Sequence, residues 1–177
     1  MRYAMVIDTL KCVGCSDCVV ACQTENNIPH GYCRDWITEA VSGSYPNVEL
    51  ELRSERCNHC DTAPCVRCCP TGASHIAEGG VVLVTADECI GCGACIESCP
   101  YDARYQHPDG HVDKCTFCYH RLEKGQLPAC VSVCPTRCMY FGDLDNPNSQ
   151  VSQLLKNRKY KTLAPEAGTN PHVFYLI

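Results

Sequence analysis

Cysteine spacing is the feature of this sequence that most restricts how the chain can fold. The chain has 177 residues and 19 cysteines, and 16 of these fall into four groups of four. Each group closes with the spacing Cys-x3-Cys, and in three groups a proline follows directly. The groups are Cys12, Cys15, Cys18 and Cys22; Cys57, Cys60, Cys65 and Cys69; Cys89, Cys92, Cys95 and Cys99; and Cys115, Cys118, Cys130 and Cys134. Such regular clustering indicates metal ligands.

The first and third groups share the spacing Cys-x2-Cys-x2-Cys-x3-Cys, the bacterial ferredoxin pattern for 4Fe-4S cubanes. Three thiolates from one tight loop can bind three irons of a cube, whereas the fourth cysteine binds the neighbouring cluster. The second and fourth groups share the frame Cys-x2-Cys-xn-Cys-x3-Cys-Pro, in which the later group has the longer gap. The sequence therefore predicts paired clusters on duplicated ferredoxin-like modules of the dicluster type, with insertions and a C-terminal extension, in the α+β fold class.

Zinc, disulfides and haem explain these cysteines less well. Structural zinc sites use two separated pairs, and disulfide scaffolds are typical of secreted chains with dispersed cysteines. Attachment of c-type haem needs a histidine directly after Cys-x2-Cys, but Asp61 follows Cys60 and Tyr119 follows Cys118. HExxH, GxSxG, P-loop and complete GxGxxG motifs are absent. We therefore expect a chain that is not an enzyme by itself.

Composition and charge narrow the function further. Leu, Ile, Val and Phe make up about a fifth of the residues, near the level at which chains stop folding on apolar burial alone. The net charge of -5 argues against a nucleic-acid partner. The longest aliphatic run, residues 81–84, is too short for a direct membrane span. Residues 1–8 contain neither an apolar signal core nor a twin arginine, so we expect no export signal.

Three cysteines stand outside the four groups. Cys68 leaves an ambiguity, because Cys65-x2-Cys68 also has ligand spacing. We assign Cys69 as the ligand because Pro70 follows it, as proline follows the fourth cysteine of the third and fourth groups. For Cys33 and Cys138 the simplest interpretation is a small buried thiol that packs like an apolar residue.

Short elements are predicted around the cysteine groups. We expect strands over 2–8 and 48–53, a helix over 18–25, a hairpin over 73–85 with its turn at 78–80, a turn at 108–110 and a helix over 149–160. Segments 23–47 and 119–129 are predicted insertion loops, a usual place for docking surfaces. The apolar residues 173–177 are expected either to lie on a partner or to close the chain's own sheet.

Five cations stand beside the predicted ligands. They are Lys11, Arg56, Arg67, Lys114 and Arg137. An oxidised cubane with four thiolates carries about two negative charges, which nearby cations offset, raising the reduction potential. For each cation the alternative is a solvated surface side chain.

The segments that connect the cysteines carry further motifs. They are Arg-Tyr-Ala-Met at 2–5, Cys-Val-Gly-Cys at 12–15, Cys-Pro-Thr-Gly-Ala-Ser at 69–74, Cys-Pro-Tyr-Asp-Ala-Arg-Tyr at 99–105, Lys-Cys-Thr-Phe-Cys at 114–118, His-Arg-Leu-Glu-Lys-Gly at 120–125, Phe-Gly-Asp-Leu at 141–144 and Phe-Tyr-Leu at 174–176. Through them the chain resembles, nearly end to end, the four-cluster iron-sulfur subunits of membrane-associated molybdopterin oxidoreductases, most closely the polysulfide reductase type.

The resemblance implies a nested pairing of the groups, first with fourth and second with third. The implied ligand sets are Cys12, Cys15, Cys18 and Cys134; Cys22, Cys115, Cys118 and Cys130; Cys57, Cys60, Cys65 and Cys99; and Cys69, Cys89, Cys92 and Cys95. Because Cys92 stands where some related subunits have tryptophan and a 3Fe-4S cluster, four 4Fe-4S clusters are implied. Residues 1–22 plus 100–140 would form an outer module and 48–99 an inner one, with 141–177 as an extension that contacts a partner or closes a sheet.

The resemblance also implies a function in anaerobic respiration. The chain would relay electrons from an integral membrane quinone-binding anchor subunit to a molybdopterin catalytic subunit, as in polysulfide or thiosulfate reductases. It would lie peripheral to the cytoplasmic membrane, on the periplasmic side by co-export with the catalytic subunit; the cytoplasmic side is the alternative. The alternative functions are a free-standing polyferredoxin and the equivalent subunit of a tetrathionate or arsenate reductase.

Overall fold

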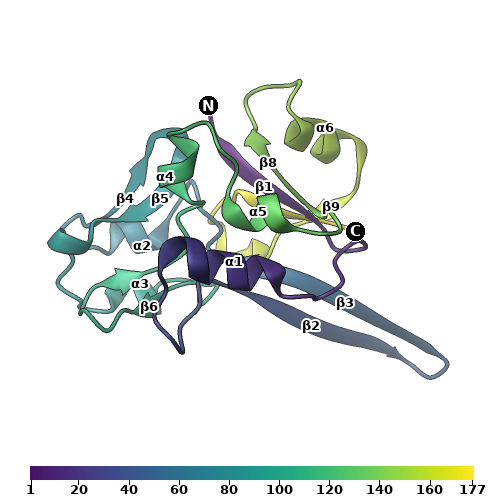
Figure 1. Ribbon diagram of the computed structural model, residues 1–177, viewed down its shortest axis with the longest axis horizontal. Coiled ribbons are helices and arrows are strands. Elements are labelled where there is room, and N and C mark those ends of the chain that lie inside the picture. Colours follow the sequence, from purple (N-terminus) through teal and green to yellow (C-terminus); the bar gives the residue numbers. More distant parts are fainter.

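The two ends of the chain meet in a four-stranded sheet at one side of the molecule (Figure 1). The structure is a computed structural model that covers residues 1–177. The strand order is β8-β1-β10-β9, with β1 at Tyr3–Asp8, β8 at Met139–Asp143, β9 at Tyr160–Lys161 and β10 at Val173–Leu176. Strand β1 pairs in parallel with β10 and antiparallel with β8. The strand predicted over 2–8 is confirmed, and residues 173–176 are a strand of the chain's own sheet.

Helix α6 (Gln150–Asn157) packs on this sheet. Ser149 caps its first turn, because the Ser149 hydroxyl accepts a hydrogen bond of 3.2 Å from the Ser152 backbone N–H. Val151 on the helix contacts a small cluster with Val6 and Leu176, all fully buried. The helix predicted over 149–160 is confirmed for residues 150–157, but Tyr160 belongs to strand β9. The helix cap is a residue type that stabilises helix starts.

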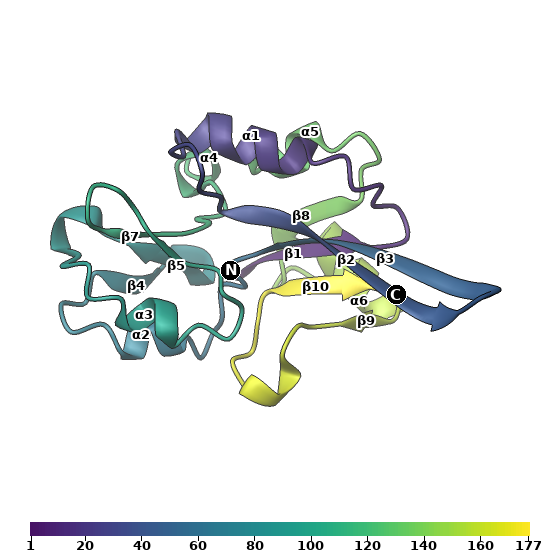
Figure 2. The same ribbon diagram turned by 90° about the horizontal axis from the view of Figure 1, so that it is seen from below.

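Two sets of short elements flank the sheet (Figures 1 and 2). Helices α1 (Asp17–Asn26) and α5 (Ala129–Val133) lie side by side next to the sheet, in line with the helix predicted over 18–25. The second set lies on the opposite side of the molecule and comprises α2 (Pro64–Arg67), α3 (Ala94–Glu97), the hairpin of β4 (Ser74–Ala77) and β5 (Val81–Val84), and the pair β6 (Tyr105–Gln106) and β7 (Val112–Asp113). Helix α4 (Tyr119–Leu122) lies against the end of α1, where Arg121 pairs with Glu25 at 2.8 Å. Short 3-10 helices occupy Glu78–Gly80, Ala86–Glu88 and Pro165–Ala167. Small sheets and short helices of this kind confirm the α+β class.

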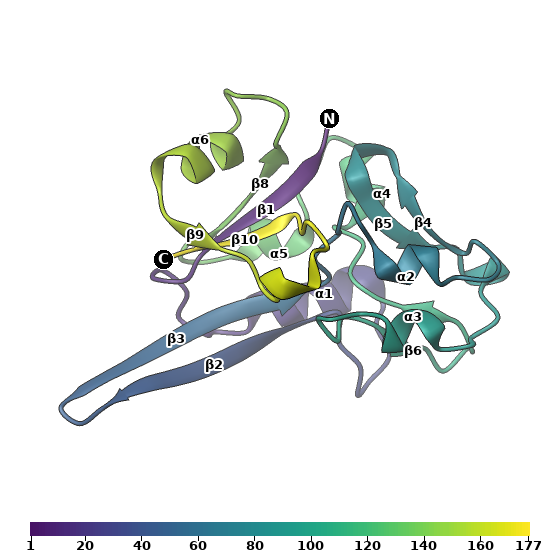
Figure 3. The same ribbon diagram turned by 180° about the vertical axis from the view of Figure 1, so that it is seen from behind.

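A long two-stranded arm projects from the body of the molecule (Figure 3). It consists of β2 (Asp35–Ser44) and β3 (Asn47–Arg56), antiparallel along their whole length from the pair Asp35 and Arg56 to the pair Ser44 and Asn47. The strand predicted over 48–53 is confirmed within β3. The loop predicted over 23–47 is wrong for its second half, because β2 exists through pairing with β3, and such pairing is weakly marked in a single strand's sequence.

Cysteines make up much of the buried interior. Eight of the 20 residues in the main buried cluster are cysteines. Its other members include Met5 and Ile7 of β1, Val81 and Val82 of β5, and Phe117. The core is therefore arranged around the cysteine groups. No helix of the structure has the length and apolar character needed to cross a membrane.

Candidate metal centres

One cavity gathers three cysteines of the first group and the last cysteine of the fourth. Cys12, Cys15, Cys18 and Cys134 line an atom-free space of about 290 Å³, its open mouth included. The first three come from the loop after β1 and the first turn of α1, and Cys134 follows α5. Helices α1 and α5 pack together, which brings residues more than a hundred positions apart to one site.

Backbone conformation explains how so short a loop can present three sulfurs. Gly14 and Ser16, which alternate with the cysteines, both have a positive φ, 66° and 63°. A side chain on Gly14 would also press against Leu52 of β3, since an ideal Cβ there would lie 3.3 Å from a Leu52 methyl carbon. Glycine at this position permits both the turn and the close approach of the arm.

A second cavity collects the remaining cysteines of these two groups. Cys22, Cys115, Cys118 and Cys130 line it together with Asn26, Arg34, Arg56 and Phe117, around an atom-free space of about 300 Å³. Burial raises the pKa of Cys115 to about 12 and that of Cys130 to about 11. Buried thiols that resist ionisation gain from binding a cation, because metal binding replaces the proton.

The second and third groups meet on the other side of the molecule. Burial, together with the neighbouring Cys57 and Cys65, raises the pKa of Cys60 to about 11. Burial also raises the pKa of Cys65, as do Cys57 and Cys99. Cys65 therefore lies within electrostatic reach of Cys57, Cys60 and Cys99. Cys99 belongs to the third group, so this site also draws on two groups.

The last predicted set is the least enclosed. Cys95 is buried and lies within electrostatic reach of Cys89 and Cys68, while Cys92 is exposed on the loop before α3. The Cys69 sulfur accepts a hydrogen bond of 3.4 Å from the Ser74 backbone N–H. The structure thus brings Cys89 and Cys95 together and gives no contact that joins Cys92 to them.

Cys68 and Cys69 differ in their surroundings. Burial would raise the pKa of Cys69, but hydrogen bonds from Ser74 and Thr71 outweigh it and lower the pKa, which favours a thiolate. The Cys68 sulfur lies 3.3 Å from the Ser98 hydroxyl oxygen and 3.7 Å from the Cys65 carbonyl oxygen. The assignment of Cys69 as ligand stays a prediction, and the amide contact supports it.

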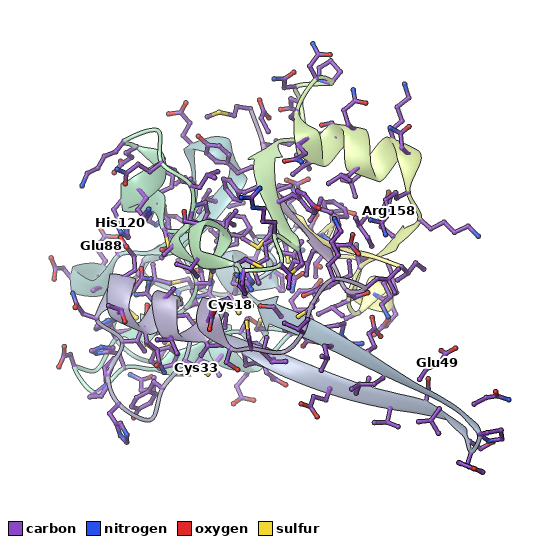
Figure 4. All side chains as sticks on the ribbon, turned by 45° about the vertical axis from the view of Figure 1, so that its right-hand side comes forward. Cys18, Cys33, Glu49, Glu88, His120 and Arg158 are labelled. Atoms are coloured by element: carbon purple, nitrogen blue, oxygen red, sulfur yellow. The ribbon has the colours of Figure 1, made fainter.

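The two other extra cysteines lie in unlike places. Cys138 is buried, as expected, lines the first cavity and has its sulfur 3.5 Å from the Cys134 sulfur. The prediction for Cys33 is wrong, because its side chain is exposed in the segment between α1 and β2. Figure 4 labels Cys33 and, among the packed elements, Cys18 at the start of α1. Cys33 lies at the rim of an open hollow that Trp36 and Tyr101 also line.

Two of the five predicted cations are buried beside the cysteines. Arg56 is 1% exposed and donates a hydrogen bond of 3.0 Å from Nη1 to the Cys130 sulfur. Burial alone would lower the pKa of Arg56, but Cys130 and Asp35 outweigh it and raise the pKa well above its ordinary value, so the guanidinium stays charged. Lys114 is also buried, and its ammonium donates to the carbonyl oxygens of Val82 and Cys115. For Lys11, Arg67 and Arg137, all exposed, the alternative of a surface side chain applies.

Arg104 is a cation that sequence reasoning missed. It is 5% exposed, and its Nη2 donates to the Cys65 sulfur and to the Ser74 hydroxyl, each at 2.9 Å. Burial alone would lower its pKa, but Cys65 and Cys57 raise it above the ordinary value. The signal available in the sequence was an arginine in the motif that follows the third group, at 99–105.

Unpartnered donors test whether these residues fit an iron-sulfur cluster. Arg104 Nε and Nη1 and Arg56 Nε are buried and have no hydrogen-bond partner. A buried guanidinium N–H without an acceptor is costly. The sulfide and thiolate sulfurs of a cubane are acceptors with net negative charge. Both arginines therefore fit a cluster held by the neighbouring cysteines.

The spacing of the sulfurs differs from that of a single-ion site. No three Cys, His, Asp or Glu side chains converge closely enough to hold one metal ion. In a cubane each thiolate binds its own iron at a separate corner, so the four sulfurs surround a volume instead of a point. The two cysteine-lined cavities have this second arrangement.

Comparisons with known proteins agree with this geometry. The family model of the 4Fe-4S dicluster domain matches residues 48–144. The arsenate respiratory reductase iron-sulfur subunit ArrB of Shewanella sp. (strain ANA-3) is 40% identical over 225 residues, covering 99% of this chain and 96% of that protein. A tetrathionate reductase subunit of Salmonella typhimurium is 44% identical, covering 99% of this chain and 72% of that protein. A selenate reductase subunit of Mesobacillus selenatarsenatis is 37% identical with the same coverage, 99% and 72%.

Proposed function

This chain belongs to the family of iron-sulfur subunits of molybdopterin-type reductases, which carry the 4Fe-4S dicluster domain, and we propose that it relays electrons through four 4Fe-4S clusters. The relay runs from an integral membrane quinone-binding anchor subunit to a molybdopterin catalytic subunit. The chain contributes no catalytic group of its own. The terminal acceptor is reduced on the catalytic subunit.

The observation that carries this proposal is the gathering of distant cysteines at two cavities. Cys134 lies with Cys12, Cys15 and Cys18, and Cys22 lies with Cys115, Cys118 and Cys130. In each set, three cysteines come from one group and the fourth comes from the other group. Ferredoxins that hold two cubanes side by side exchange their fourth ligands in the same way. This exchange of ligands supports two clusters in the outer module.

The inner module is proposed to hold the other two clusters in the same way. Its ligand sets are Cys57, Cys60, Cys65 and Cys99, and Cys69, Cys89, Cys92 and Cys95. The electrostatic contacts of Cys65 with Cys57 and Cys99 support the first set. The contact between Cys95 and Cys89 supports part of the second.

The protein's own residues set the conditions for electron transfer. When bound, each cubane supplies a site that takes up and releases one electron. Arg56 and Arg104 hold positive charge next to the ligand sulfurs. Phe117, 1% exposed and stacked on His59 with ring centroids 3.7 Å apart, lines the cavity of Cys22, Cys115, Cys118 and Cys130. The positive charges favour uptake of an electron by a negatively charged centre, whereas burial away from water opposes it, because less polar surroundings disfavour the more highly charged state.

The proposed location is the periplasmic face of the cytoplasmic membrane, within the complex and after co-export with the catalytic subunit. It rests on the family resemblance. Immunogold labelling or protease protection of spheroplasts, with the complex expressed whole, tests it. Protection of this chain from added protease in intact spheroplasts would place it on the cytoplasmic side instead.

Metal analysis tests the function as a whole. Chain purified anaerobically with its complex should contain about sixteen irons and about sixteen acid-labile sulfides, and potentiometric EPR titration should resolve reversible one-electron signals. Zinc in place of iron, or iron that does not change oxidation state, contradicts the proposal. Recovery of the iron-loaded chain alone, without a molybdenum protein or membrane protein, would favour a free-standing polyferredoxin.

A further inference from the structure

The β2–β3 arm has two chemically different faces. Side chains alternate along a strand, and residues opposite each other in the register share a face. One face carries Ile37, Glu39 and Val41 of β2 opposite Ser54, Leu52 and Leu50 of β3, followed by the pair Gly43 and Val48. On the other face, the charged residues Glu49, Glu51, Arg53 and Glu55 of β3 lie opposite Ser42, Ala40, Thr38 and Trp36 of β2. We call the first of these the apolar face of the arm.

The inner half of the apolar face is part of the first candidate metal centre. Ile37 lines the cavity of Cys12, Cys15 and Cys18. The Ser54 hydroxyl lies 3.5 Å from the Cys18 sulfur and is fully buried. Leu52 packs over Gly14 in the same loop. This half of the face has a partner, which is the loop of the first cysteine group.

The outer half of the apolar face has no partner in the chain. Every residue from 41 to 50 is exposed, including Val41 at 71%, Leu50 at 58% and Val48 at 55%. The arm is a sheet of only two strands, and Figure 4 shows Glu49 far out along it, well away from Cys18. An isolated two-stranded hairpin is marginally stable in water, so a face of aliphatic residues at its far end is suited to burial against another molecule.

The mouth of the first cavity adds to this surface. Val13, which lines the cavity with Ile37, is 61% exposed, and Cys15 is also exposed. A strip of mainly aliphatic residues, interrupted by the exposed Glu39, therefore runs from the mouth of a candidate cluster site outward along the arm. A molecule seated on the strip would cover the mouth, exclude water from it and bring its own redox centre near the cluster.

The charges on the arm restrict what that molecule can be. The ionisable acids between residues 39 and 51 are Glu39, Glu49 and Glu51, and this stretch contains no Lys, Arg or His. Glu51 is paired with Lys161 at 2.8 Å, which leaves Glu39 and Glu49 exposed without an ion pair. An anionic lipid surface is repelled by this arrangement, as is the equally acidic arm of a second copy. A protein with an apolar groove bordered by Lys or Arg is attracted.

We propose that the apolar face of the arm is the docking surface for a neighbouring protein subunit of the reductase complex. Val41, Val48 and Leu50 form the centre of this surface, and Val13 forms its inner end. The neighbouring subunit presents an apolar groove bordered by basic residues and exchanges electrons at the cluster of Cys12, Cys15, Cys18 and Cys134. This proposal rests on the proposed function. The exposed Tyr45 at the tip, a residue type common at interface hot spots, extends the same contact.

The test uses the complex co-expressed under anaerobic conditions with an affinity tag on this chain. The double variant Val41→Ser, Leu50→Ser should retain the parent's iron content and EPR signals, because neither side chain touches a cysteine. It should recover at least about tenfold less of the neighbouring subunit, the scale of one lost interface anchor. The matched control is Ile76→Ser, an exposed aliphatic residue on β4, which should recover that subunit like the parent. Equal recovery by the double variant and the parent overturns the docking proposal.

A second measurement identifies the occupant and separates the two proposals. In the full complex, the variant Tyr45→p-benzoylphenylalanine should form a crosslink to a subunit of the complex on illumination. The double variant Glu39→Lys, Glu49→Lys should bind the neighbouring subunit more weakly than the parent, and the loss should be larger at low salt than at high salt. A crosslink to a second copy of this chain, or tighter association of the lysine variant with the neighbouring subunit, overturns the inference. In either case, the presence of iron that is reversibly reduced supports the proposed function. The absence of iron-sulfur clusters contradicts the proposed function itself.

Discussion

At the scale of single residues, the buried arginines are the side chains that, after the cysteines, most affect the chemistry of the candidate metal centres. Arg56 donates to the sulfur of Cys130 and Arg104 to the sulfur of Cys65, and both cysteines are predicted ligands. Both arginines keep unpartnered N–H groups in buried surroundings. Positive charge held there stabilises the reduced, more negative state of a neighbouring cluster.

Replacing Arg104 tests this effect. Arg104→Gln should lower the reduction potential of the cluster bound by Cys65, because it removes a charged hydrogen-bond donor 2.9 Å from that sulfur. A tenfold change in the reduction equilibrium corresponds to about 59 mV for one electron, and we expect a shift of about this size in a potentiometric EPR titration. Arg67→Gln, an exposed arginine two residues from Cys65, is the control. Equal potentials in both variants would assign Arg104 a structural role only.

The extra thiol of the first cavity has a different expected outcome. Cys138→Ser should leave iron content unchanged, because Cys138 packs behind Cys134 and is not needed to complete that set of four. Cys134→Ser should convert or remove one cluster. Iron and sulfide analysis with EPR on the anaerobic complexes distinguishes the two, and loss of iron in the Cys138 variant would make Cys138 a ligand.

At the scale of elements, the sequence predicts correctly those strands and helices that depend on interactions between neighbouring residues. The hairpin predicted over 73–85 forms as β4 and β5 with its turn at 78–80, where Gly79 has φ of 76° and approaches the Tyr3 ring. The insertion 119–129 begins with the helical turn α4. Strand β2 was missed because its partner strand, more than its own pattern, stabilises it.

The cap of α6 offers a quantitative test at this scale. Ser149→Ala removes the hydroxyl that accepts from the Ser152 N–H and should cost about 1 kcal/mol, which lowers Tm by about 2–4 °C for a protein of this size. Anaerobic circular dichroism melts of the holoprotein measure it. Ser42→Ala, exposed on the arm, should melt like the parent, and an equal drop in both variants would exclude a capping effect.

At the scale of the whole molecule, the clusters and the fold depend on each other. Eight of the 20 main core residues are cysteines, and aliphatic residues are few. The predicted ligands that share a cavity come from segments far apart in the chain, residues 12–22 and 115–134. Binding of a cluster by such a set would hold these two segments together.

Removal of iron should accordingly unfold the protein. Anaerobic treatment with a strong iron chelator is expected to abolish most of the far-ultraviolet circular dichroism, because metal binding supplies folding free energy that apolar burial here does not. Reconstitution with iron and sulfide should restore it. An apoprotein with an unchanged spectrum would show that the polypeptide folds without its metal.

The sequence by itself determined the ferredoxin-like α+β class, the four cysteine groups and the strands and helices with local signals, because ligand spacing, alternation and capping are properties of neighbouring residues. The family resemblance implied that Cys134 joins Cys12, and the tertiary structure places both at one cavity. Only the tertiary structure decided that Cys33 is exposed, that Arg104 is buried against Cys65, and that β10 pairs with β1. It also decided that β2 and β3 form a projecting arm. Those features depend on contacts between residues far apart in the chain, which arise only when the whole polypeptide packs around its metal centres.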